Sequence, residues 1–155
     1  MKEILLTGGL VTQVDDEDYE YLNQFKWRIN RGSNGVPYAI KCGSPRYENP
    51  VLMHRFILGC PNGIAVDHRD MNTLNNTRIN IRIADYTQNN ANRIKQKNNT
   101  SGFRGVCWER NRARWRAKIA FHRKRIHLGY FKCKEDAIKA YRLAAIKIFG
   151  EYYRE

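Results

Sequence analysis

The sequence predicts an α+β protein built from two small modules that differ in charge and in strand pattern. Its 155 residues leave room for one ordinary domain or two small ones. Residues 1–92 carry ten Lys or Arg and ten Asp or Glu, whereas residues 93–155 carry 18 and five, so the whole excess of +13 lies in the last part. A basic excess confined to one segment favours a polyanionic partner, because each cation placed on a phosphate releases a counterion.

Short strands and helices, separated by turn residues, are expected in the first module. Gly8 and Gly9 can supply the positive φ angles of a tight turn, which predicts a hairpin of strands 4–7 and 10–15. The apolar spacing from residue 19 to residue 25 predicts a helix that ends at residue 25. A second hairpin is then expected from strands at residues 26–30 and 38–42, followed by a short helix at 51–58. Two further strands are expected at 64–66 and 81–83, and a helix at 87–93.

The second module follows a polar, basic linker at residues 94–102. Apolar and polar side chains alternate strictly over residues 114–122, which predicts a strand with one core face and one cationic face. A further strand is expected at 126–128 and a helix at 134–149. The apolar stripe of this helix is predicted to hold Ala137, Tyr141, Ala144 and Ile148. The expected fold is a three-stranded antiparallel sheet packed on one helix.

Cysteine spacing and hydropathy exclude several classes of protein. The four cysteines lie far apart, which predicts reduced thiols rather than a zinc knuckle or a disulfide framework; they are Cys42, Cys60, Cys107 and Cys133. No long apolar run occurs, and the N-terminal segment turns acidic too soon for a signal peptide. We therefore expect a cytoplasmic protein, in a bacterial or phage-infected cell, with no membrane association.

Polar residues recur in a specific order over residues 52–93. An Asp-His pair at 67–68 is followed by Asn-x-Leu-Asn-Asn at 72–76, then by Asn80 and Asn89. Over nearly the whole of this unit the sequence resembles the HNH homing endonucleases of phage and intron-encoded mobile elements. The resemblance implies a ββα-metal nuclease unit, in which strand, long loop, strand and helix carry the active site, with the N-terminal hairpins attached to it.

The residue types suit phosphodiester hydrolysis, which needs an activated water and relief of charge at the scissile phosphate. By resemblance His68 is the general base, a role that imidazole suits because its ordinary pKa lies near working pH. Asp67 and Asn89 match the oxygen ligands of a single ion per active site, Mg²⁺ or Mn²⁺. Asn80 matches the middle asparagine of the motif, which ties the loop to the second strand and orients the histidine.

Other polar residues of this unit have simpler interpretations. Three loop asparagines are predicted to be turn residues only: Asn72, Asn75 and Asn76. His54 is predicted to be a packed helix residue rather than a phosphate contact. Where many relatives have Asp-Gly-Asn after the histidine, this chain has Met71 at the central position, so a turn glycine is missing.

The last module resembles the AP-two/ERF DNA-binding domain of plant transcription factors and phage nucleases. Its markers are FRGV at 103–106, WRA at 115–117, LGYF at 128–131, AY at 140–141 and AA at 144–145. In that family the sheet enters the major groove of double-stranded DNA. The resemblance implies DNA contacts from Arg104, Arg114, Arg116, Lys118, Arg123 and Arg125. Cys107 and Glu109 stand where plant domains have arginines, which predicts a different target sequence.

The remaining rings of the module are divided between core and surface. Trp115, Tyr130 and Tyr141 are predicted to lie in the core, whereas Trp108 has no assigned side. His122 and His127 are expected to face DNA or solvent.

These observations predict a nuclease domain at residues 1–93, a basic linker at 94–102 and a DNA-binding domain at 103–155. The predicted function is a site-specific, divalent-metal-dependent DNA endonuclease, a nickase, in which the last module supplies location and the first supplies cleavage. The alternative is a DNA-binding regulator with an inactive HNH fold. An RNA-binding or RNA-modifying protein would share the charge pattern but has no support from the sheet-helix motif. Nothing in the sequence indicates an obligatory protein partner.

Overall fold

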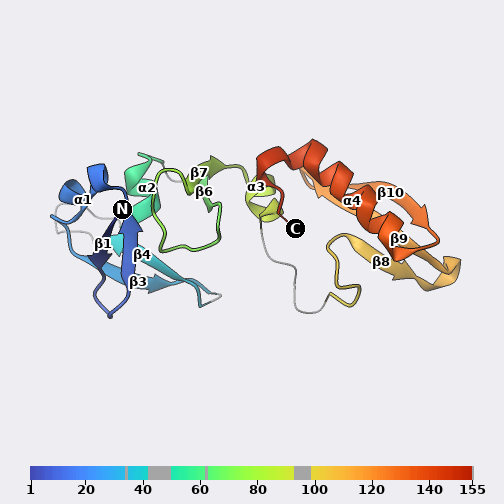
Figure 1. The fold of residues 1–155 in the computed structure, drawn as a ribbon, viewed down its shortest axis with the longest axis horizontal. Helices are drawn as coiled ribbons and strands as arrows, with labels where there is room; N and C mark the ends of the chain where they lie inside the picture. The colour runs from blue at the N-terminus through green and yellow to red at the C-terminus, as the bar shows by residue number, and fades with distance from the viewer. Residues whose placement is uncertain (34, 42–49, 62, 93–98, 155) are drawn as a thin grey trace. The chain divides into compact units, whose positions relative to one another are not determined.

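The structure is a computed structural model that describes residues 1–33, 35–41, 50–61, 63–92 and 99–154. These residues form two compact units, Met1–Asp85 and Tyr86–Glu155 (Figure 1). The division differs from the domain boundary expected at residue 93, because helix α3 (Tyr86–Ala91) buries Ala91 in the core of the second unit. Most of the predicted linker, residues 94–98, lies outside the described residues.

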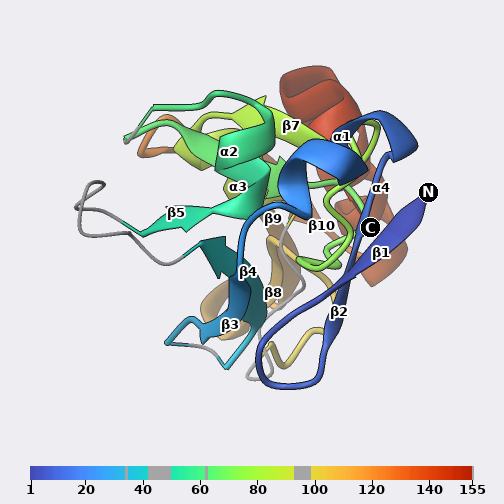
Figure 2. The same cartoon turned by 90° about the vertical axis from the view of Figure 1, so that its left-hand side faces the viewer.

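The first unit consists of short strands and short helices. In chain order these are β1 (Lys2–Leu5), β2 (Val11–Val14), α1 (Asp16–Leu22), β3 (Trp27–Arg31), β4 (Pro37–Lys41), β5 (Val51–Leu52), α2 (Met53–Ile57), β6 (Ala65–His68) and β7 (Ile81–Ala84). β1 with β2 and β6 with β7 form antiparallel hairpins, and β3, β4 and β5 form a three-stranded sheet in that order. Helix α2 packs against β4 and β5 of this sheet (Figure 2).

Two predicted helices of this unit are shorter than expected. Strand β5 pairs with the end of β4, so only α2 remains helical within the segment predicted over 51–58. Helix α1 ends at Leu22, where the backbone N–H of Asn23 closes the last turn on Tyr19. Phe25, expected to belong to the helix, instead lies in the turn that follows and packs against the core.

The core of the first unit joins the N-terminal hairpin to the strands that bear the predicted catalytic residues. Its buried side chains are Ile4, Leu6, Val14, Leu22, Trp27, Ala39, Met53, Ile57 and Ile81. The indole Nε1 of Trp27 donates to the carbonyl of Leu22 at 2.8 Å, which satisfies the polar end of the ring. Because β1, β2 and β7 share this core, the position of β7 is set by hydrophobic packing.

The second unit has the predicted three-stranded antiparallel sheet packed on one helix. After α3 its elements are β8 (Val106–Glu109), the 3-10 helix η1 (Arg110–Arg112), β9 (Arg114–Phe121), β10 (Lys124–Phe131), α4 (Lys134–Phe149) and the 3-10 helix η2 (Gly150–Tyr152). The sheet order is β10, β9, β8, and α4 lies along one face (Figure 1). Ala117 and Ile119 are buried under α4, which confirms the core face predicted for β9.

The buried stripe of α4 differs from the predicted one in its last two turns. Ala137 and Tyr141 are buried as expected, but Ala145 and Phe149 complete the stripe. Ala144 and Ile148 were predicted there and are only half-buried at its edge. A row spaced four residues apart stays on one side of the helix, and this is the row that meets the sheet.

Two of the broader expectations can be compared with the described residues. Cys60, Cys107 and Cys133 are free thiols, as predicted, and Cys42 lies outside the described residues. Among the helices that the structure describes, none combines the length and apolarity needed to cross a membrane.

Candidate active site and nucleic-acid interface

The β6–β7 hairpin carries two of the predicted catalytic residues. Asp67 and His68 end β6, opposite Arg82 and Ile81 of β7. Both Asp67 and His68 are buried, each with 5% of its surface exposed. Successive residues of a strand point to opposite faces, so the carboxylate and the imidazole have different neighbours.

Asp67 is paired with a buried arginine. Nε and Nη2 of Arg82 both donate to Oδ2 of Asp67, at 2.9 and 2.8 Å. The side chains of Arg82 and Asp67 are only 7% and 5% exposed. Buried charges persist in proteins when they neutralise each other in this way. The predicted metal ligand therefore has a cationic neighbour that the sequence analysis did not identify.

His68 ends a chain of buried hydrogen bonds that starts on β2. Its Nε2 lies 3.3 Å from Oδ1 of Asn76, and Nδ2 of Asn76 donates to Oγ1 of Thr12 at 2.8 Å. The hydroxyl of Thr12 in turn donates to the carbonyl of Leu74 at 2.8 Å. Asn76 was expected to be a turn residue only, and this is corrected: it is fully buried and contacts the predicted base.

His54 packs beside His68, as expected of a helix residue in the core. The two imidazole rings meet edge to face, with centroids 5.0 Å apart and planes at 90°, and Tyr38 contacts both. Burial, with smaller electrostatic contributions from His68 and Arg55, lowers the pKa of His54 to about 3. Burial also lowers the pKa of His68, although Asn76 and the carboxylates of Asp70 and Asp67 act in the opposite direction. Both rings are therefore neutral at neutral pH.

Asn80 fastens the long loop that follows β6. Its Oδ1 accepts from the backbone N–H of Asp70 at 3.0 Å, and its Nδ2 donates to the carbonyl of Asn75 at 2.7 Å. Desolvation raises the pKa of the Asp70 carboxyl, but hydrogen bonds from Asn75, Asn72 and Asn80 hold that pKa below its ordinary value. Asn80 thus ties the start and the middle of the loop to the residue that precedes β7, and Asn76 contributes a hydrogen bond to the His68 ring.

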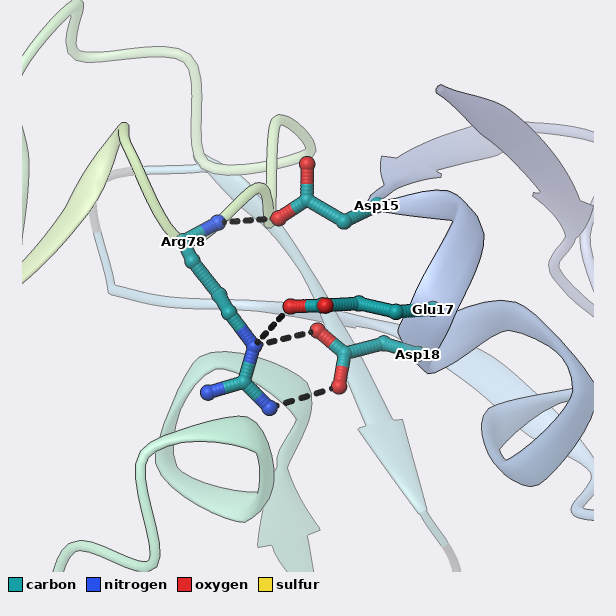
Figure 3. A network of polar contacts seen from close by, with 4 residues as sticks. All are labelled: Asp15, Glu17, Asp18 and Arg78. Atoms are coloured by element: carbon teal, nitrogen blue, oxygen red, sulfur yellow. Dashed lines mark hydrogen bonds and ion pairs between the residues drawn. The ribbon is translucent and has the colours of Figure 1, made fainter.

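A second clamp joins the same loop to helix α1. Figure 3 shows Arg78 facing three carboxylates at the start of α1. Its Nε and Nη2 bind the two oxygens of Asp18 at 2.8 and 2.6 Å, and Nε lies 3.2 Å from Oε1 of Glu17. The backbone N–H of Arg78 donates to Asp15 Oδ2 at 2.7 Å. A bidentate pair of this kind fixes orientation, so α1 holds the loop that bears Asn75 and Asn76.

Met71 occupies the position at which the turn glycine is missing. Its φ is +64°, in the left-handed region that favours glycine. Its backbone N–H donates to the carbonyl of His68 at 2.9 Å, so the strained residue closes the turn directly after the predicted base. The turn therefore forms without glycine, at the cost of backbone strain.

Asn89, the other predicted metal ligand, lies half-buried in α3 of the second unit. Arg104 holds the end of this helix: its Nη1 donates to the carbonyl of Ala91 at 2.7 Å, and its Nη2 donates to the carbonyl of Asn90. The guanidinium of Arg104 thus caps α3, and the predicted contact of Arg104 with DNA stays a prediction. Within the described ranges, no three His, Cys, Asp or Glu side chains gather as a metal site.

The face of the second unit's sheet that points away from α4 is cationic. Arg114, Arg116 and Lys118 alternate along β9 with the buried residues, as predicted. Nη1 of Arg116 lies 2.7 Å from Oε2 of Glu109 on β8, and its Nη2 lies 3.5 Å from Sγ of Cys107. Glu109 and Cys107 therefore orient an arginine from the neighbouring strand.

Tyr130 belongs to this cationic face and not to the core, where it was predicted. The register of β10 shifts between His127 and Gly129, which brings Tyr130 opposite Arg116. Tyr130 is 40% exposed, its ring lies 4.6 Å from that of His127, and Arg112 stacks over it at 4.8 Å. Tyr141 is buried in the core, as predicted, whereas Trp115 is only partly buried and packs against the core; Trp108 is about half exposed and contacts Trp115.

A cavity of about 640 Å³ lies in the second unit, lined by α3, the loop from Asn99 to Arg104 and the β9–β10 hairpin. Lys118, Arg123 and Arg125 line it with positive charge, and α3 contributes Thr87 and Asn90 as neutral hydrogen-bonding groups. Basic and amide side chains together suit the oxygens of a phosphodiester backbone.

Local sequence patterns could not reveal Thr12 and Asn76 as hydrogen-bonding partners within the site. Thr12 lies in the N-terminal hairpin, 64 residues from Asn76 in the chain, and nothing in its neighbourhood marks it. Arg82 could have been noticed, because it is a charged residue between Ile81 and Ile83 in a predicted strand. The structure alone shows that Arg82 faces Asp67.

The chain resembles a viral protein over most of its length. It is 29% identical over 150 residues to an uncharacterized HNH endonuclease of Acanthamoeba polyphaga mimivirus, and the match covers 93% of this chain and 73% of the relative. It is also 39% identical over 59 residues to Protein 3.8 of Escherichia phage T7, where the match covers 38% of this chain and about half, 49%, of the relative.

No protein-family profile matches the chain, and no solved structure matches it. The mimivirus relative is described as an HNH endonuclease, the class whose motif order the Asp-His pair and Asn80 of this chain resemble.

Proposed function

We propose that this protein is a divalent-metal-dependent DNA endonuclease of the HNH type, a site-specific nickase whose C-terminal unit binds double-stranded DNA. The observation that carries the proposal is the buried Asp67–His68 pair at the end of β6, followed by a loop fastened through Asn80. The mimivirus relative described as an HNH endonuclease supports the same reaction class.

His68 acts as the general base in this proposal. Its ring is buried, contacts Asn76 through Nε2, and packs against His54, so its orientation is restrained before substrate binds. A neutral imidazole can take a proton from the water that attacks the phosphorus. Asn80 acts through the loop and does not need to touch the substrate.

Asp67 would be a ligand of one Mg²⁺ or Mn²⁺ ion, and Asn89, which belongs to the second unit, stays a predicted ligand from the order of the sequence motif. A carboxylate oxygen and an amide oxygen are donors that a hard cation prefers, and such ions are commonly held by one or two carboxylates together with substrate phosphate. When bound, the ion would neutralise charge on the scissile phosphate and on the leaving oxygen. Arg82 supports the site by keeping the Asp67 carboxylate oriented within the strand ladder.

The second unit supplies the DNA-binding surface, as an AP-two/ERF-like module. Arg114, Arg116 and Lys118 project from the face of the sheet opposite α4, and Arg123 and Arg125 add charge at the cavity beside it. Arg104, which caps α3, would contribute by holding that helix in place. Contacts with phosphate give affinity, and contacts with base edges give the sequence preference.

One observation favours a second candidate, a DNA-binding regulator that does not cleave. The Asp67 carboxylate is already paired with Arg82, and a full ion pair competes with a cation for the same group. In that case the DNA-binding unit would function without hydrolysis.

Incubation of the full chain with supercoiled plasmid and Mg²⁺ separates the two candidates. The nuclease predicts conversion to relaxed circles that stops when a chelator is added, and a nickase predicts few linear products. Asn89→Ala should lose both cleavage and the calorimetric signal of Mg²⁺ binding, because removal of one ligand empties a weakly held site. Intact plasmid under all conditions, with tight DNA binding, would favour the regulator.

A salt titration tests the DNA-binding surface. Arg114→Ala combined with Arg116→Ala should shallow the salt dependence of duplex binding by about one unit for each lost phosphate contact. Lys139→Ala combined with Lys147→Ala removes the same charge from exposed positions of α4 and serves as the matched control. Equal slopes for the two double variants would argue against a specific role for the sheet.

A further inference from the structure

A directional chain of hydrogen bonds runs from the N-terminal hairpin to His68. Thr12 lies on β2, and its hydroxyl donates to the backbone carbonyl of Leu74 at 2.8 Å. A hydroxyl has a single proton, and a carbonyl oxygen can only accept. Oγ1 of Thr12 can therefore only accept from its next neighbour.

That neighbour is the side-chain amide of Asn76. Its nitrogen, Nδ2, donates to Thr12 Oγ1 at 2.8 Å. A flipped amide would have to take the hydroxyl proton that Thr12 now donates to the carbonyl of Leu74, so the Thr12–Leu74 hydrogen bond selects the present orientation of the amide. The amide oxygen then faces Nε2 of His68, at 3.3 Å.

An imidazole nitrogen that faces an acceptor must carry the proton. We propose that Thr12 and Asn76 are positioning residues that hold the neutral ring of His68 in its Nε2–H tautomer, with the lone pair on Nδ1. The consequence for cleavage rests on the proposed function, in which His68 is the base. The tautomer itself follows from the hydrogen-bond directions and can be measured without any cleavage.

The surroundings restrain the alternatives. Thr12 and Asn76 have no exposed surface, so bulk water cannot replace either of them. The backbone N–H of Asn76 donates to the carbonyl of Gln13, and that of Gln13 donates to the carbonyl of Leu74, both at 2.8 Å. These bonds hold the loop in register with β2, so the amide and the hydroxyl meet at a fixed spacing.

The tautomer decides which nitrogen takes the proton in the proposed reaction. As the water oxygen bonds to phosphorus, its O–H bond breaks and the proton passes to Nδ1 of His68. The leaving oxygen departs with the electron pair of its bond to phosphorus. The imidazolium that results still donates from Nε2 to Asn76 Oδ1, so the same contact serves both protonation states.

Nuclear magnetic resonance of the full chain tests the tautomer directly. In protein labelled with ¹⁵N-histidine, protonated and unprotonated ring nitrogens resonate far apart, and two-bond couplings to the ring protons tell Nδ1 from Nε2. The chain has four histidines, and the signals of His68 are those missing from His68→Gln. At a pH where the rings are neutral, we expect Nε2 of His68 to carry the proton. A protonated Nδ1 would overturn the proposal.

Three variants test the role of the chain of hydrogen bonds. Thr12→Val removes the hydroxyl, so the amide of Asn76 can flip; we expect a mixture of His68 tautomers and a kcat lowered roughly tenfold, the worth of one buried hydrogen bond, with KM unchanged. Thr12→Ser restores the hydroxyl and should restore both the tautomer and kcat. Val14→Ala lies on the buried side of the same strand and controls for lost stability.

The two ideas can fail separately. If the wild-type protein does not cleave DNA, the proposed function fails while the tautomer measurement still decides the inference. If Thr12→Val keeps the wild-type tautomer and kcat, the positioning role is wrong even though the nuclease is real.

Discussion

Arg82 places its guanidinium on the carboxylate of Asp67 directly across the β6–β7 ladder, with Nη2 and Oδ2 2.8 Å apart in a site closed to solvent. The pair sits next to His68, the proposed base, and it uses the carboxylate that is proposed to bind the metal ion. Stability and catalysis therefore depend on the same side chain.

Replacement of Arg82 by methionine should destabilise the protein by about 3–5 kcal/mol, because it leaves the charge of Asp67 buried without its partner. Urea unfolding measures this loss. The double variant Arg82→Met with Asp67→Asn removes both charges and should recover much of it. A single variant within about 1 kcal/mol of wild type would show that the pair does not stabilise the fold.

Glycine in place of Met71 should stabilise the protein by about 1 kcal/mol. The left-handed backbone at φ +64° is strained for methionine and relaxed for glycine. Met71→Ala keeps the Cβ atom and with it the strain, so this control should show no gain. Thermal unfolding of the three proteins decides the matter, and a less stable Met71→Gly would contradict the assigned strain.

Local sequence patterns predicted the elements of the fold better than the contacts of the site. The alternation of apolar and polar residues in β9 and the spacing of apolar residues in α4 predicted the sheet and the helix of the second unit, because both patterns repeat within a few residues. No repeating pattern in the sequence marks the β-bulge that turns Tyr130 outward, so this bulge could not be predicted. Asp67 and His68 could be singled out because they end a strand in a known motif, whereas Thr12 reaches Asn76 only through the tertiary fold.

Arg123→Gly should stabilise the second unit while weakening its hold on DNA. His122 and Arg123 form the two-residue turn between β9 and β10, with φ of +44° and +64°, a conformation that favours Asn-Gly. We expect a gain of about 1 kcal/mol and a salt dependence shallower by about one unit. His122→Asn relieves similar strain without removing a cation. If Arg123→Gly bound DNA with an unchanged salt slope, Arg123 would not be a phosphate contact.

Stability should fall as the pH drops below that of ordinary histidine titration. Burial lowers the pKa of His54 from 6.5 to about 3. Between these two pH values the unfolded chain binds a proton at His54 and the folded chain does not. The contribution of neutral His54 to the free energy of unfolding is fully present above about pH 6.5. It is lost towards pH 3, by at most about 1.4 kcal/mol per pH unit.

The variant His54→Phe keeps a ring between Tyr38 and His68 but cannot titrate. Urea unfolding at pH 7 and pH 5 should therefore show a smaller loss for this variant than for wild type. An equal loss in both proteins would mean that His54 is accessible to protons in the folded state.

The most direct test of the nuclease compares the nicking rate of supercoiled plasmid by wild type and by His68→Ala, at saturating Mg²⁺ and equal DNA occupancy. Loss of a general base should lower the rate by about 10²–10⁴-fold. Gel-shift affinity should stay the same, because His68 lies in the first unit and the excess cations lie in the second. A variant that nicked within a few-fold of wild type would show that His68 is not the base and would contradict the proposed active site.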